Sequence, residues 1–222
     1  GRVKDQFVSE IYARIKSIKD KRLKDRIATY FSIAINSYSS MAQNVLDDAI
    51  NLVKTKEYRS ILVEFHQINS IGKPAYNFSL PDINGKIITL DNFLGKVVFI
   101  DFWFSGCLNC VKYYQDVVSK VEEKMNDDNV IFMSVCIDTD KRKWINSVNS
   151  GIYTSPQNSI NLYTNGKGVD HPVIKKYGIT VCPSVLIIGK KGELLMKNVD
   201  KLRSQTVESL YGILKDFTNA AN

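Results

Sequence analysis

Residues 97–110 read VVFIDFWFSGCLNC, an apolar run of strand length that leads directly into a pair of cysteines. Only Asp101 interrupts the apolar run, which predicts a strand buried on both faces of a largely parallel sheet. Residues 108–125 follow with apolar side chains at spacings of three and four, which predicts a helix. The sequence therefore places Cys107 where a buried strand passes into a helix, with Cys110 one helical turn later.

This position favours thiolate chemistry. The start of a helix supplies unpaired backbone N–H groups and the positive end of the helix dipole, both of which stabilise a thiolate. The pKa of a thiol there can fall from about 8.5 to between about 3.5 and 7.5. Because three residues separate Cys107 from Cys110, the second sulfur can reach back to form a disulfide. The pair therefore predicts thiol–disulfide exchange, in which one thiolate attacks a substrate disulfide and the other resolves the mixed disulfide.

Outward from this stretch, strands and helices continue to alternate. Strands are expected at 76–80, 86–90, 130–137, 159–164, 181–188 and 193–197, and helices after Asp140, at 173–177 and at 206–217. Asn84-Gly85 is a strong hairpin signal between the first two of these strands. The order strand, helix, strand, followed by a hairpin and a helix, predicts an α/β sandwich.

The first part of the chain has a different pattern. Residues 3–68 carry apolar side chains at spacings of three or four in successive stretches, which predicts helices. No proline occurs before Pro74, which favours helices over a strand-and-turn module. Breaks between the helices are expected near Asp20, at 37–40 and near Lys54. We therefore expect a helical N-terminal segment or cap at 1–70 and a second domain at 71–222.

Composition and charge exclude several classes of protein. The 222 residues are 44% hydrophobic and 24% charged, which is ordinary globular usage and excludes collagen, low-complexity disorder and a coiled-coil rod. The net charge of +7 is spread along the chain, so no nucleic-acid partner is expected. Neither histidine has a companion at metal-ligand spacing, and we expect neither a metal nor a cofactor. No apolar run approaches the ~18 residues of a membrane span, so a membrane anchor is expected only from a segment upstream of Gly1.

Three matched elements carry a resemblance to a known family. They are the strand leading to Cys107 and Cys110, the Val181-Cys182-Pro183-Ser184 segment, and the hairpin and loop that precede the strand. Residues 76–217 resemble the thioredoxin fold, and most closely the bacterial extracytoplasmic thiol-disulfide oxidoreductases of the TlpA/ResA type. The resemblance implies a thioredoxin-like sandwich with a central mixed sheet, here preceded by an all-helical N-terminal segment. It also implies an extracytoplasmic bacterial enzyme that acts on protein thiols and disulfides and receives electrons from an upstream donor.

The same resemblance assigns catalytic roles to four residues. Cys107 matches the exposed attacking thiol, and Cys110 matches the resolving thiol beneath it. Pro183 matches the proline that faces the dithiol and follows a cis peptide bond. Asp101 matches a buried acid near the resolving sulfur, where a carboxylate in an apolar strand is suited to take and return a proton. The alternative, in which Asp101 is a hydrogen-bonded structural acid, remains open.

Substrate contact is expected from Trp103, Cys182 and Pro183. Trp103 is expected to pack beneath the active-site turn and orient it. Cys182 is expected to line the substrate groove as a small residue, with a third redox thiol as the alternative. The residues between the cysteines are Leu108 and Asn109 rather than the Gly and Pro of thioredoxin. The resemblance therefore does not predict the reduction potential of the Cys107–Cys110 pair.

Two alternative functions stay open. A peroxiredoxin-like peroxidase would carry Pro-x-x-x-Thr/Ser-x-x-Cys around its attacking cysteine. Here the proline is missing and the Ser105 hydroxyl falls one position off, which disfavours that chemistry. A non-catalytic thioredoxin-fold binding module is disfavoured by the intact cysteine pair, although residues 1–70 leave room for an added binding function.

Overall fold

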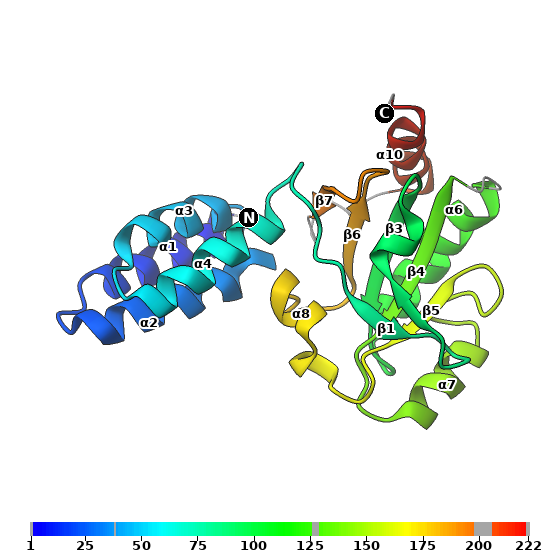
Figure 1. Cartoon of the computed structure of the whole chain (residues 1–222), viewed down its shortest axis with the longest axis horizontal. Coiled ribbons are helices and arrows are strands. Elements are labelled where there is room, and N and C mark those ends of the chain that lie inside the picture. The colour runs from blue at the N-terminus through cyan, green and yellow to red at the C-terminus, as the bar shows by residue number, and fades with distance from the viewer. Residues whose placement is uncertain (1, 38, 126–128, 198–205, 221–222) are drawn as a thin grey trace. The chain divides into compact units, whose positions relative to one another are not determined.

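The computed structural model describes residues 2–37, 39–125, 129–197 and 206–220 (Figure 1). The chain separates into two compact units, Gly1–Ser70 and Ile71–Asn222. Each unit has a hydrophobic core of its own. Within the described ranges, no helix is both long and apolar enough to cross a membrane.

The first unit is helical. Its helices are α1 (Arg2–Lys16), α2 (Lys21–Ala34), the short 3-10 helix η1 (Ile35–Ser37), α3 (Ala42–Leu52) and α4 (Lys56–Asn69). Helices end and begin near Asp20 and Lys54, as the sequence predicts. The third predicted break, at 37–40, includes residue 38, which lies outside the described ranges. Asp20 begins α2 because its side chain accepts a hydrogen bond from Leu23 N at 2.7 Å. The inward faces of the helices pack through Val8, Leu46, Leu62 and their neighbours.

A buried carboxylate stabilises this unit. Asp25 of α2 accepts hydrogen bonds from Lys54 N at 2.9 Å, and from Thr55 N and Oγ1 at 2.7 and 2.8 Å. Burial alone would raise the pKa of Asp25, but these three donors favour the carboxylate and lower the pKa overall. Asp25 therefore fixes the loop between α3 and α4 against α2.

The second unit is built on a mixed sheet, which confirms the predicted fold class. Its five described strands are β3 (Val97–Trp103), β4 (Val130–Cys136), β5 (Ile160–Tyr163), β6 (Ser184–Ile188) and β7 (Leu194–Lys197), in the order β5-β4-β3-β6-β7. The β3, β4 and β5 strands are parallel, β6 is antiparallel to β3, and the edge strand β7 is antiparallel to β6. Every residue of β3 is buried, as expected of the central strand. The hairpin predicted around Asn84-Gly85 forms a separate antiparallel pair, β1 (Ser79–Pro81) and β2 (Ile87–Thr89).

Helices cover the sheet. They are α5 (Leu108–Tyr113), the π-helix η3 (Tyr114–Val118), α6 (Ser119–Lys124), α7 (Lys141–Asn149), α8 (Pro172–Tyr177) and α10 (Val207–Asn219), with short 3-10 turns at Leu90–Phe93 (η2) and Gly168–Asp170 (η4). The helix predicted over 108–125 is confirmed over 108–124, with a π turn at Tyr114–Val118 between its two α-helical parts. Tyr113, the last residue of α5, and Tyr114, the first residue of the π turn, are both buried in the core.

One face of β3 connects this core to the cysteines. Alternate side chains of a strand share a face, so Val97, Phe99, Asp101 and Trp103 all point to the same side. Val97 and Phe99 pack against α5, η3, α6 and α10, of which α6 and α10 lie next to each other (Figure 1). Trp103 lies in a second cluster, which contains both cysteines of the pair. The face thus leads from the main core to the candidate site.

Candidate active site

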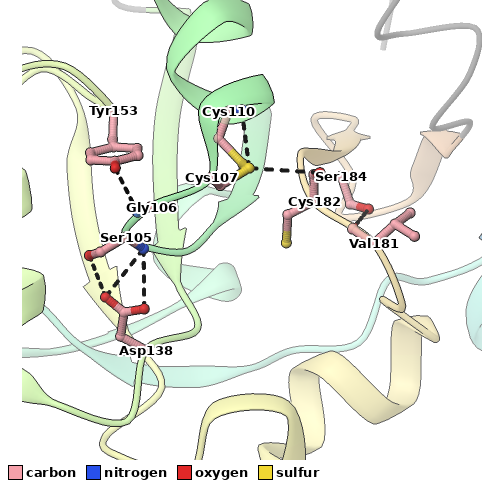
Figure 2. The surroundings of a disulfide bond; sticks show 9 residues. All are labelled: Ser105, Gly106, Cys107, Cys110, Asp138, Tyr153, Val181, Cys182 and Ser184. Atoms are coloured by element: carbon pink, nitrogen blue, oxygen red, sulfur yellow. Dashed lines mark hydrogen bonds between the residues drawn. A yellow bond between two sulfur atoms is a disulfide. The ribbon is translucent and has the colours of Figure 1, made fainter.

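The cysteine pair lies at the end of β3. Cys107 is the N-cap residue of α5, and its sulfur accepts a hydrogen bond from Cys110 N at 3.1 Å. A disulfide joins the two residues, with an S–S distance of 2.01 Å and a Cα–Cα distance of 5.2 Å (Figure 2). The Cys107 side chain is 6% exposed, whereas Cys110 is fully buried. Cys107 is therefore the outer sulfur of the pair.

A proline loop faces the outer sulfur. The Cys182–Pro183 peptide bond is cis. The carbonyl oxygen of Cys182 lies 3.8 Å from Cys107 Sγ, and Ser184 Oγ closes the loop by donating to Val181 O at 2.5 Å (Figure 2). The Cys182 side chain points away from the disulfide and keeps its thiol. Strand β6 begins at Ser184 rather than at the predicted Val181, because proline has no N–H to donate to a sheet.

Residues far along the chain hold the turn that precedes Cys107. Ser105 N donates to both carboxylate oxygens of Asp138 at 3.2 and 3.3 Å, and Ser105 Oγ donates to the same carboxylate (Figure 2). Gly106 N donates to the hydroxyl of Tyr153 at 2.7 Å. Gly106 has a φ of +98°, a backbone conformation that only glycine adopts readily. The turn therefore has a defined shape that fixes the position of Cys107.

Trp103 supports this turn from below. Its indole N–H donates to Ser134 Oγ at 2.5 Å, and its ring stacks on Tyr153 with centroids 4.7 Å apart. Trp103 is fully buried, so it cannot contact a substrate protein, and its assignment to substrate binding is corrected to support of the turn. Tyr153 thus joins the buried tryptophan to the backbone of Gly106.

Asp138 and Tyr153 also hold the turn, although neither was predicted as a site residue from the sequence. A signal for Asp138 existed, because it directly follows a predicted buried strand that runs parallel to the strand before Cys107. The carboxyl ends of parallel neighbours meet at one edge of a sheet, and here Trp103 pairs with Cys136. Tyr153 lies in an irregular segment after α7 and carries no comparable signal.

The predicted acid Asp101 and the thiol of Cys136 are both buried in the sheet. Asp101 lies in β3 opposite Ser134 of β4 and lines a small cavity that Glu122 of α6 also lines. Cys136 is fully buried at the end of β4, and burial, with Asp138 close by, raises the pKa of its thiol. A buried thiol with a raised pKa is poorly nucleophilic, so Cys136 is a packing residue.

A groove opens along α5 and η3, next to Pro183. It has a volume of about 360 Å³ and is lined by Asn109, Lys112, Tyr113, Asp116, Val117 and Pro183. Apolar side chains surround Cys107: Leu108 is 82% exposed, and Phe104 and Val181 are about 40% exposed. An extended polypeptide could lie against Pro183 in this groove with a sulfur close to Cys107.

Comparison with known proteins gives consistent matches. A family model described as thioredoxin-like matches residues 95–194, a range that contains both cysteines and Pro183. The thiol-disulfide oxidoreductase ResA of Bacillus thuringiensis (strain Al Hakam) is 30% identical over 159 residues, covering 67% of this chain and 79% of that protein. ResA of Bacillus subtilis (strain 168) is 25% identical over 146 residues, covering 66% of this chain and 76% of that protein.

Solved structures share the fold. The thioredoxin domain of a thiol-disulfide oxidoreductase from Bacteroides vulgatus has a TM-score of 0.56 at 22% identity, covering 68% of this chain and 99% of that one. A thiol-disulfide oxidoreductase from Bacteroides fragilis has a TM-score of 0.54 at 20% identity, covering 65% and 98%. At these identities the structural likeness concerns the fold alone.

Proposed function

This chain belongs to the ResA family of thiol-disulfide oxidoreductases, and we propose that it reduces or exchanges disulfides of exported proteins, with Cys107 as the attacking thiol and Cys110 as the resolving thiol. The observation that carries this assignment is the disulfide at the end of a buried strand, with one sulfur outermost and facing the Pro183 loop. We place the protein outside the cytoplasm, as the resemblance to this family implies.

The first step is attack by Cys107. In the reduced protein its thiolate lies at the N-cap of α5, where the Cys110 N–H and the helix N-terminus stabilise the negative charge. The thiolate attacks one sulfur of the substrate disulfide. A Cys107–substrate disulfide forms, the substrate's own disulfide breaks, and the first substrate thiolate leaves and takes a proton from solvent.

The second step is resolution by Cys110. Its thiol is buried, so its proton needs an internal acceptor, and we assign that role to Asp101. The Cys110 thiolate then attacks Cys107 Sγ, the mixed disulfide breaks, and the second substrate thiol is released. Two electrons have passed from the dithiol to the substrate, and the Cys107–Cys110 disulfide remains. An upstream electron donor must reduce it before the next cycle.

The substrate is held by the groove and the proline loop. We place the substrate chain between α5 and Pro183, where the backbone of Cys182 already approaches the outer sulfur. The apolar rim formed by Phe104, Leu108 and Val181 suits non-polar side chains next to the substrate cysteine. Such side chains are accessible in unfolded or partly folded proteins, which is the state in which most protein disulfides can be reduced.

Replacement of each cysteine tests the assignment. Cys107→Ser should abolish insulin reduction, because the attacking thiolate is lost. Cys110→Ser should stop turnover and accumulate a mixed disulfide on Cys107, visible on non-reducing gels. Cys136→Ser is the matched control, since it removes a buried thiol outside the exchange path and should retain turnover. Normal turnover by Cys110→Ser would contradict the proposed roles.

A further inference from the structure

Two buried carboxyl groups line one small cavity beside the central strand of the sheet. Asp101 reaches it from β3, and Glu122 reaches it from α6. The cavity has a volume of about 10 Å³, close to the ~10–15 Å³ that a single water molecule needs. Its wall is polar: it includes the hydroxyl of Thr154, which is buried and has no hydrogen-bond partner among the described residues. A small cavity with several polar groups is the kind of site that holds a bridging water.

Glu122 is held at the outer end of this cavity. Its two carboxyl oxygens accept hydrogen bonds from the hydroxyl of Tyr114 at 3.3 Å and from the hydroxyl of Ser159. Burial raises the pKa of Glu122, although the two donors act in the opposite direction. Ser159 is partly exposed, so this end of the cavity lies close to solvent, whereas Asp101 at the other end is buried in the central strand.

The charged and titratable groups around Glu122 come from several elements. They are Asp101 from β3, Tyr114 from η3, Tyr153 from the segment after α7, and Glu123 from α6 itself. From β4 the cavity receives only Phe132, Met133 and Ser134. Burial and the Glu122 charge raise the pKa of Tyr114, which keeps that phenol neutral and able to donate. Within the described part of the chain, Asp101 is therefore the carboxyl group that shares the cavity with Glu122.

From this arrangement we propose that Glu122 is a positioning residue for the redox cycle. During resolution, Glu122 passes protons through the cavity between Asp101 and solvent. The inference rests on the proposed function, because it assumes that Asp101 accepts the Cys110 proton. The Cys110 thiol gives its proton to the Asp101 carboxylate, and the resulting thiolate supplies the electron pair of the new Cys107–Cys110 bond. The proton then passes across the cavity to the Glu122 carboxylate and leaves at the Ser159 end. The relay itself moves no electrons.

The pH dependence of resolution tests this relay. Ellman's reagent serves as the disulfide, reactions are quenched in acid, and mass spectrometry counts the adduct on Cys107 over time from pH 5 to 9. Glu122→Gln keeps an acceptor oxygen for one hydroxyl and turns an NH2 group toward the other, which can accept from it, but the amide cannot take a proton. We expect its resolving rate at pH 7 to fall about tenfold. We also expect the inflection of its pH–rate profile to move, because an ionisable neighbour of Asp101 has been replaced by a neutral one.

Glu123→Gln is the matched control. Glu123 is the next residue on the same helix, but it is exposed and does not line the cavity, so the variant should move the profile far less than Glu122→Gln does. The double variant Asp101→Asn, Glu122→Gln should resolve no more slowly than Asp101→Asn alone, because both residues act in one path. A Glu122→Gln profile with an unmoved inflection, or a double variant whose losses multiply, would overturn the relay.

A measurement on the unaltered protein covers the case in which Glu122→Gln does not fold. Carboxyl ¹³C signals of Asp101 and Glu122 should each show both inflections of a coupled pair as the pH is varied. One independent inflection for each carboxyl group would equally overturn the proposal. If the relay tests fail but Cys110→Ser still accumulates a mixed disulfide on Cys107, the relay is wrong and the roles of the two cysteines are unaffected. If Cys110→Ser turns over normally, both the cysteine roles and the relay are wrong.

Discussion

Replacing Asp138 with alanine tests how strongly the turn before Cys107 depends on one carboxylate. Asp138 is buried and receives three hydrogen bonds from Ser105, two from its N–H and one from its hydroxyl. The substitution removes all of these at once. Ser105 Oγ would still have a partner, because Ser147 Oγ lies 2.7 Å away. The Ser105 N–H would have no acceptor.

The expected cost follows from these contacts. A buried N–H group left without an acceptor costs about 1–3 kcal/mol, and a lost hydrogen bond to a charged group costs about 1.5–3 kcal/mol. The remaining contact with Ser147 recovers part of the second loss, and removing a buried carboxylate removes its desolvation penalty. We therefore expect Asp138→Ala to lower the free energy of unfolding by about 3 kcal/mol. With a urea dependence of about 1–3 kcal/mol per molar, the midpoint should fall by about 1–3 M.

Tryptophan fluorescence during urea unfolding is a suitable assay. The chain has two tryptophans, Trp103 and Trp144, and both lie in the second unit, so the signal reports that unit without contribution from the helices of the first. Ser105→Ala is the matched control: it removes the hydroxyl but keeps the N–H bonds to Asp138, and should cost about 1 kcal/mol. If Asp138→Ala unfolds within 0.5 kcal/mol of wild type, the turn does not depend on this carboxylate as we argue.

Three further predictions concern other parts of the chain. Asp101→Asn should slow resolution by Cys110 more than the first attack, and pre-steady-state kinetics across pH separate the two steps; equal rates at neutral pH would reduce Asp101 to a structural acid. Iodoacetamide at pH 8 should label Cys182 of the oxidised protein and spare Cys136, because burial raises the pKa of the Cys136 thiol; peptide mapping checks this. The Cys182→Ala variant should retain turnover, which an insulin reduction assay checks. The pKa of Asp25 in the folded protein lies below its unfolded value of about 4. The stabilisation that the Asp25 carboxylate gives is therefore complete above about pH 4 and is lost as the pH falls through the folded pKa. Asp25→Asn should make acid unfolding, followed by circular dichroism, less dependent on pH.

Most elements around the dithiol could be predicted from the sequence, because their signals are local. The apolar run with one acid predicts the central strand, and the spacing of Cys107 and Cys110 places both on the first turn of a helix. Two departures have local causes that periodicity does not reveal. A π turn follows Tyr113 within the predicted helix, and Pro183 delays the start of β6.

The contacts that shape the site were decided only by the tertiary structure. Ser105 meets Asp138 across 33 residues, Gly106 meets Tyr153 across 47, and Cys107 meets the Cys182 carbonyl across 75. The cavity shared by Asp101 and Glu122 likewise joins a strand to a helix. Residue type and spacing specify which atoms a segment buries, because burial follows the period of the strand or helix. Which distant atoms meet there depends on strand register and on the paths of loops, and these are set by the packing of the whole sheet and its helices.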